Sequence, residues 1–156
     1  MHKALLAVLA LLPVTGVALA QPQHRTFTVP FHVKHSLILL EAEINGKPRV
    51  MVLDTGAQST IVDVSALGSV QQFDLEHAHV NGNTAGSHGE TEASTVDLKL
   101  GEKKWSDRVV GVMNLSEVSK RFGVQIDGLL GQDVLQEFSA VRIDYKKHVV
   151  ELELGE

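Results

Sequence analysis

Residues 50–62 are the most informative segment of the chain and read VMVLDTGAQSTIV. Four apolar residues run directly into Asp54, Thr55 and Gly56, and the apolar pattern resumes after three polar positions. A short apolar run that stops at a glycine turn is typical of a buried strand, so we expect Asp54 to lie where a strand ends. A carboxylate in such a water-poor place is costly unless it is hydrogen-bonded, paired or protonated, and carboxylates placed this way are often functional.

The tripeptide Asp54-Thr55-Gly56 is a weak signal by itself, because a strand followed by an Asx turn explains it equally well. Thr55 can hydrogen-bond locally, and Gly56 allows another backbone or a substrate to approach closely. The choice between a turn and a functional site therefore depends on the rest of the chain.

Residues 1–20 have the features of a signal peptide. Lys3 gives a positive start, residues 4–17 are almost wholly apolar, and Ala18-Leu19-Ala20 places small residues at the cleavage signal, so we expect cleavage before Gln21. The apolar run is too short to span a bilayer comfortably, although an uncleaved membrane anchor is the alternative. We therefore expect an exported protein, periplasmic in a bacterium or secreted, with no stable membrane anchor after cleavage.

The composition narrows the possible partners. The chain has no cysteine, which excludes disulfides and thiolate metal sites. Its net charge is −5, which becomes −6 once Lys3 is removed, and a mildly acidic surface does not suit nucleic acid or anionic lipid. His77 and His79 would share one face of a strand and His88 follows nearby, but the ligand spacing of a zinc site is missing. We expect these to be surface or flap histidines, with no metal and no cofactor.

The hydropathy pattern predicts a mainly β domain. Residues 27–34 alternate around Pro30 and suit an edge strand, while Asn45-Gly46 is a strong hairpin signal between residues 37–44 and 50–53. We divide the chain into a signal peptide (1–20), an N-terminal arm and edge strand (21–34) and one domain (35–156). Further strands are predicted over residues 73–80, 91–100, 105–112, 138–145 and 148–154, a helical turn or loop over 64–70, and short helices over 116–122 and 132–137.

A second motif supports a functional role for Asp54. Residues 127–135 read DGLLGQDVL, a short apolar segment closed by Gly131 that leads into a short helix. Together with the segment around Asp54, this motif resembles the retropepsin-like aspartic proteases, and more closely the exported bacterial aspartyl protease-like group. The resemblance extends over residues 37–154 and implies an all-β fold: a single acid-protease barrel with a flap hairpin and one or two short helices.

The resemblance also implies roles for individual residues. Asp54, Thr55 and Gly56 would form the catalytic motif, with Thr55 bracing the two loops of a dimer and Gly56 contacting the substrate backbone. Leu129, Leu130 and Gly131 would support the Asp54 loop from beneath. Further residues are expected to bind substrate, one beside the catalytic pair and the others on a glycine-rich flap: Ala57, Gly82, Gly86, His88 and Gly89.

Peptide hydrolysis by carboxylates needs two of them, one ionised to take a proton from water and one protonated to polarise the scissile carbonyl. This chain has one Asp-Thr-Gly and is about half as long as a two-lobed pepsin-like enzyme, so the second Asp54 would come from a second copy across a two-fold axis. Retroviral members usually form an ion pair near the dimer interface at the positions that hold Gln58 and Gln132 here. The predicted homodimer therefore lacks an interaction that stabilises the dimer in those relatives, so the sequence supports the fold more strongly than the dimer.

Three other residues have simpler interpretations. Asp127 is predicted to bond a turn or a helix end rather than act in catalysis. Asp133 is predicted to be an acid favoured by the helix dipole or by capping. Trp105, the only tryptophan, is predicted to pack in the core or against a hairpin.

The preferred function is an exported aspartic endopeptidase that acts on a peptide or protein substrate as a homodimer. One alternative is a non-catalytic peptide-binding or interaction module on the same fold, and another is a structural envelope protein in which Asp-Thr-Gly is only a turn. A catalytic pair that shares a proton suggests a pH optimum below neutral.

Overall fold

The structure is a computed structural model that describes residues 25–68 and 92–155. Six of its strands form a closed barrel in the order β2-β3-β7-β4-β6-β5, and β5 pairs back onto β2. These strands are β2 (Leu37–Ile44), β3 (Lys47–Leu53), β4 (Ile61–Asp63), β5 (Glu92–Leu100), β6 (Lys103–Met113) and β7 (Gly128–Leu130). The all-β barrel expected from the sequence is confirmed.

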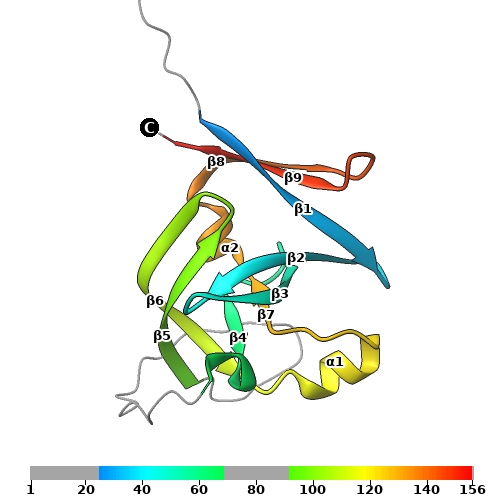
Figure 1. Cartoon of the computed structure of the whole chain (residues 1–156), viewed down its shortest axis with the longest axis vertical. Helices are drawn as coiled ribbons and strands as arrows, with labels where there is room; N and C mark the ends of the chain where they lie inside the picture. The colour runs from blue at the N-terminus through cyan, green and yellow to red at the C-terminus, as the bar shows by residue number, and fades with distance from the viewer. Residues whose placement is uncertain (1–24, 69–91, 156) are drawn as a thin grey trace, which may run out of the picture.

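A second layer of sheet lies across one end of the barrel (Figure 1). It consists of β1 (Thr26–Lys34), β9 (Val149–Leu154) and β8 (Phe138–Asp144), and β1 joins it to β2. The two ends of the described chain lie side by side, since the Leu154 N–H donates to the Arg25 carbonyl at 2.9 Å. The predicted arm of residues 21–24 lies outside the described residues.

Residues 27–34, which were predicted to form an edge strand, belong to β1, and β1 links the barrel to the second layer of sheet. Residues 26–30 of β1 pair with β9, and residues 31–34 pair with β2, so each half of the strand has one pairing partner. Pro30 is the last residue paired with β9, and β1 changes neighbour immediately after it. A proline, which has no N–H, is tolerated there because it falls where one ladder ends.

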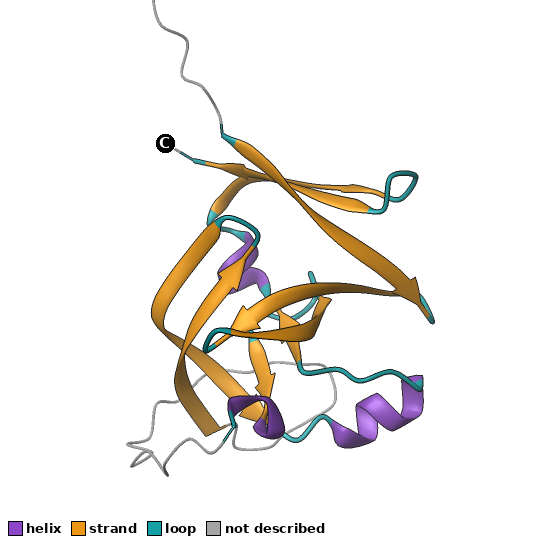
Figure 2. Ribbon diagram, in the orientation of Figure 1, coloured by secondary structure: helices purple, strands orange, loops and turns teal. Residues whose placement is uncertain are grey.

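Within residues 25–68 and 92–155, helices are few and short, as Figure 2 shows. They are the 3₁₀ turn η1 (Val64–Leu67), α1 (Ser116–Phe122) and α2 (Gln132–Leu135). The helices predicted over 116–122 and 132–137 are therefore confirmed, the second in a shorter form. Among the described residues, no helix is long and apolar enough to cross a membrane.

The hairpin of β2 and β3 turns at Asn45 and Gly46, which both have positive φ (51° and 74°), as a tight Asn-Gly turn requires. Alternate residues of this hairpin face two different apolar clusters. Leu40, Met51 and Leu53 face the main core, while Leu39 and Val52 face a smaller cluster that includes Ile126 and Phe122. Both faces of β3 are therefore covered, which explains the unbroken apolar run before Asp54.

The main core continues from the barrel into the second layer of sheet. Phe138 at the start of β8 makes edge-to-face contacts with Phe27 and Trp105, at ring-centroid distances of 6.0 and 6.1 Å. Trp105 is thus a packing residue of the β5–β6 hairpin, as predicted, and its indole N–H donates to Glu137 at 2.7 Å.

Candidate active site

The order of strands brings the two sequence motifs together. β7 lies between β3 and β4, although β3 and β4 follow one another in the chain. The loop of residues 54–60, which joins β3 to β4, must therefore pass over the end of β7. Leu53 pairs with Leu130 in parallel register, and this places Gly131 directly beneath that loop.

Gly131 is needed because the loop passes so close to it. A Cβ atom built on Gly131 would lie 2.6 Å from the Ser59 carbonyl carbon and 2.9 Å from the Thr60 nitrogen. The backbone of Gly131 is extended (φ −94°, ψ −178°), so lack of space and not backbone strain excludes a side chain. The predicted support by Leu130 and Gly131 has a clear geometric basis.

Asp54 is half-buried at the carboxyl end of β3, as predicted. Its N–H donates to the Leu130 carbonyl at 3.1 Å, and its carboxylate Oδ1 accepts a 2.9 Å hydrogen bond from the Gly56 N–H. The Ala57 N–H donates to the Asp54 carbonyl at 3.3 Å. These bonds fix the backbone of the turn and one carboxylate oxygen.

The other predicted residues of the motif differ in exposure. Thr55 and Gly56 are exposed, while Ala57 is only 1% exposed and packs beneath the turn. Leu130 is fully buried and Leu129 is half-buried in the smaller cluster. The flap residues predicted to bind substrate (Gly82, Gly86, His88 and Gly89) lie outside the described residues, as do His77 and His79.

The first turn of α2 holds the loop from the other side. The Gln132 N–H donates to the Ala57 carbonyl at 2.8 Å, and the Asp133 N–H donates to the Gln58 carbonyl at 3.1 Å. The Gln132 side-chain amide donates to the Thr55 carbonyl at 2.8 Å. Gln132 occupies a position that contributes to an interface ion pair in retroviral relatives. It cannot form that ion pair, but its side chain bonds to the Asp54 loop of the same chain.

Sequence reasoning missed the buried polar group beneath this loop. Thr60 is fully buried, and both its N–H and its hydroxyl donate to Asp133 Oδ1 at 2.8 Å. The Thr60 hydroxyl also accepts from the Gly131 N–H at 3.1 Å. A hydroxyl residue at the start of an apolar strand was the available signal, since a buried polar group requires partners. Asp133 lies in the first turn of α2 as expected, but it serves this loop.

Asp127 comes directly before β7, at the end of that strand farther from Asp54, and lies beside Val50 of β3. Its carboxylate accepts hydrogen bonds from the Val50 N–H and the Gln125 side chain, both at 2.8 Å. The carboxylate therefore bonds to the backbone of β3 and to a neighbouring side chain, and not to a turn or a helix end as predicted. The described part of the chain contains no group of three or more side chains arranged to hold a metal ion.

Comparison with known proteins agrees with this geometry. A family model described as aspartyl protease matches residues 40–134, which include both motifs. The chain therefore belongs to the aspartyl protease family, and this membership supports proteolysis as its general activity. No curated protein matches the chain.

Solved structures with the same fold include a retropepsin-like aspartic protease from Rickettsia conorii. It is 17% identical, with a TM-score of 0.57 over 86% of this chain and 97% of that one. The retroviral protease-like domain of Ddi1 from Leishmania major is 19% identical, with a TM-score of 0.49 over 80% of this chain and 98% of that one. The first of these similarities shows a retropepsin-like fold.

Proposed function

We propose that the protein is an exported aspartic endopeptidase that works as a homodimer, with Asp54 of each chain forming the catalytic pair. The observation that carries the proposal is the position of Asp54: half-buried at a strand end, on a turn braced by Leu130 and Gly56. Such bracing holds a reacting group in one geometry, which catalysis requires.

The chemistry needs a second carboxylate close to the first. Two nearby carboxylates share one proton because both cannot be ionised at once, and the pair then supplies a base and an acid. The ionised member takes a proton from a bound water, and the protonated member polarises the peptide carbonyl. One Asp-Thr-Gly motif in the chain supports a two-fold axis that passes beside the Asp54 turn.

An extended peptide is the substrate class that fits this arrangement. A peptide held as an added strand gains affinity from backbone hydrogen bonds and selectivity from side-chain pockets. The exposed Gly56 would face the peptide backbone, and the glycine-rich segment of residues 81–89 would close over it as a flap. Export is proposed from the charged start, the apolar run and the cleavage signal of residues 1–20.

The test compares residues 21–156 with the Asp54→Asn variant. Each is incubated with a complex peptide mixture from acidic to neutral pH, and new termini are identified by mass spectrometry. The proposal predicts cleavages that only the wild type makes, more abundant below neutral pH. Identical termini from the two proteins, at concentrations that favour a dimer, would refute it.

A second candidate, a non-catalytic peptide-binding module, is favoured by one observation. Gln58 and Gln132 stand where retroviral relatives have an interface ion pair, and the Gln132 amide bonds to Thr55 within its own chain. A module of this kind would bind peptides from the same mixture, leave them intact and remain a monomer.

A further inference from the structure

α2 is a single turn of helix, and it is the platform on which the Asp54 loop rests. Its first two N–H groups donate to the carbonyls of Ala57 and Gln58. A helix of four residues is not stable by its own hydrogen bonds, so its position depends on tertiary contacts. Any displacement of α2 is passed directly to the loop that carries Asp54.

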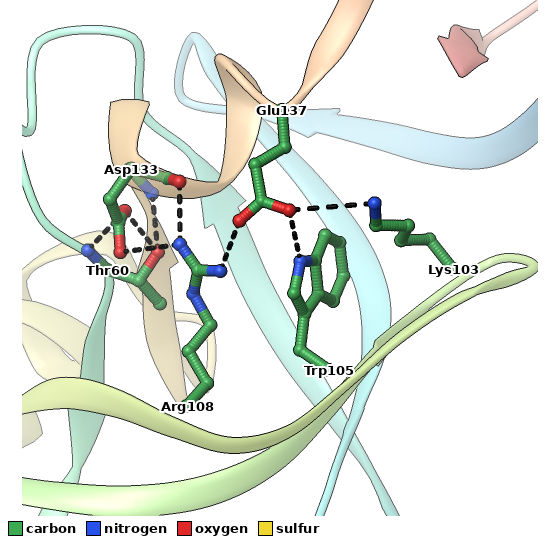
Figure 3. Close-up of polar contacts among 7 residues, drawn as sticks. Thr60, Lys103, Trp105, Arg108, Asp133 and Glu137 are labelled. Carbon is green, nitrogen blue, oxygen red and sulfur yellow. Dashed lines mark hydrogen bonds and ion pairs between the residues drawn. The ribbon is translucent and has the colours of Figure 1, made fainter. Parts of the chain in front are cut away.

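Arg108 on β6 makes a side-chain hydrogen bond to the end of α2 (Figure 3). Its guanidinium donates to the Asp133 carbonyl at 2.6 Å and to the Glu137 carboxylate at 2.5 Å. The N–H groups that follow the helix donate to the carbonyls of Gln132 and Val134 and not to that of Asp133. Arg108 therefore supplies a donor to a carbonyl at the helix end that the backbone leaves free.

The same guanidinium reaches the Asp133 carboxylate, at 3.4 Å. The other oxygen of that carboxylate binds the N–H and hydroxyl of Thr60, where the Asp54 loop ends. A continuous set of contacts thus runs from Arg108 through Asp133 to Thr60, as Figure 3 shows. Only 16% of the Arg108 side chain is exposed, so water screens these contacts weakly.

Neighbouring side chains hold Arg108 in this orientation. Its guanidinium lies 5.6 Å from the Trp105 ring centre. The Glu137 carboxylate accepts from Arg108 and from the Trp105 indole, with Lys103 at 3.5 Å. Arg108 is the member of this group that also reaches Asp133, whereas the Lys103 ammonium group contacts Glu137 and the Trp105 ring.

We propose that Arg108 is a positioning residue for Asp54: by fixing α2 and the Asp133–Thr60 contact, it sets the geometry of the Asp54 loop. The inference deepens the proposed function and rests on it for its catalytic consequence. Its structural consequence, a loop ordered by Arg108, is measurable without any activity. A planar guanidinium suits the task because it bonds to α2 and to Glu137 in two fixed directions at once.

The test uses the full mature chain with Arg108→Met and, as the matched control, Lys103→Met. Both variants remove one positive charge from the same cluster, but only the first removes a contact with α2. Hydrogen exchange is measured by mass spectrometry on peptides that cover residues 54–60 and 131–135, with residues 138–154 as an internal reference. We expect Arg108→Met to exchange about 10-fold faster in the first two segments only, and Lys103→Met to match the wild type.

Kinetics provide the second readout, at enzyme concentrations where specific activity no longer depends on concentration. We expect Arg108→Met to lower kcat about 10-fold with KM changed less than about twofold, because the reacting group and not the binding surface is displaced. Arg108→Lys keeps the positive charge but not the planar guanidinium with its two bonding directions. Its kcat should therefore lie between those of the wild type and Arg108→Met. If Arg108→Met does not fold, Arg108→Lys is compared with Lys103→Met instead.

Unchanged exchange in residues 54–60 and 131–135, or a loss of kcat no larger than that of Lys103→Met, would overturn the inference. The two proposals fail separately. If the wild type cleaves nothing while Arg108→Met still loosens the loop, the proposed function fails and the ordering role stands. If the wild type cleaves peptides and Arg108→Met behaves like Lys103→Met, only the positioning role fails.

Discussion

Gly131→Ala is the perturbation that most directly tests why the Asp54 loop has its shape. The new methyl carbon would lie 2.6 and 2.7 Å from the carbonyl carbon and oxygen of Ser59. Ordinary contacts at such a carbon are 3.4–4 Å, and the obstacle is backbone, so the loop must move by most of an ångström. Overpacking of this kind costs about 1–3 kcal/mol of folding free energy, which corresponds to a Tm lower by about 4–12 °C.

The assay is thermal unfolding by circular dichroism, together with peptide cleavage at a temperature where both proteins are folded. We expect kcat to fall about 10-fold or more, because the same displacement moves Asp54. Gly155→Ala is the matched control, since a methyl group there meets nothing within 4 Å. A Gly131→Ala protein with the Tm of Gly155→Ala would refute the close approach of loop and glycine, and an unchanged kcat at lowered Tm would refute its link to Asp54.

Two further predictions concern buried polar groups. Thr60→Val removes a fully buried hydroxyl that binds Asp133 and Gly131, and should lower the free energy of unfolding in urea by about 1–3 kcal/mol. Thr60→Ser, which keeps the hydroxyl, should lower the free energy of unfolding by less. An equal decrease in Thr60→Ser and Thr60→Val would contradict the stabilising role of these hydrogen bonds. Burial raises the pKa of Asp63, but hydrogen bonds from the Ser65 side chain and from the N–H groups of Leu115 and Ser65 outweigh it, so the pKa lies below its ordinary value of 3.8. Because the folded pKa is lower than the unfolded one, this stabilisation is complete above the unfolded pKa and is lost as pH falls through the folded pKa. Tm should therefore fall below about pH 4, and fall less in Asp63→Asn; an equal drop in both proteins would exclude Asp63 as a source.

The local features of the site could be predicted from the sequence because each is encoded within a few residues. Asn45-Gly46 specifies the hairpin turn, and the apolar run before Asp54 specifies a buried strand. The position of Gly131 beneath the Asp54 loop was implied by the resemblance to retropepsin-like proteases, which the two motifs carry.

Features that depend on distant partners could not be predicted in this way. The role of β1 as the link between two sheets depends on pairing with β9, more than a hundred residues later, and Pro30 falls where β1 changes from β9 to β2. β4 has only three residues and is a strand because β6 and β7 flank it. The sequence explains Asp133 as a helix-dipole or capping acid and gives no role to Arg108, because their contact forms only when the barrel brings β6 against α2.

The most direct test of the central claim, that two copies of Asp54 form one site, is a mixing experiment. A fixed amount of wild type is allowed to exchange subunits with increasing amounts of Asp54→Asn, and peptide cleavage per wild-type chain is measured. Random pairing predicts that activity falls to about one half at equal amounts and about one tenth with a ninefold excess of the variant. Activity per wild-type chain that stays constant across the mixtures would show that each Asp54 works without a partner, and would contradict the account.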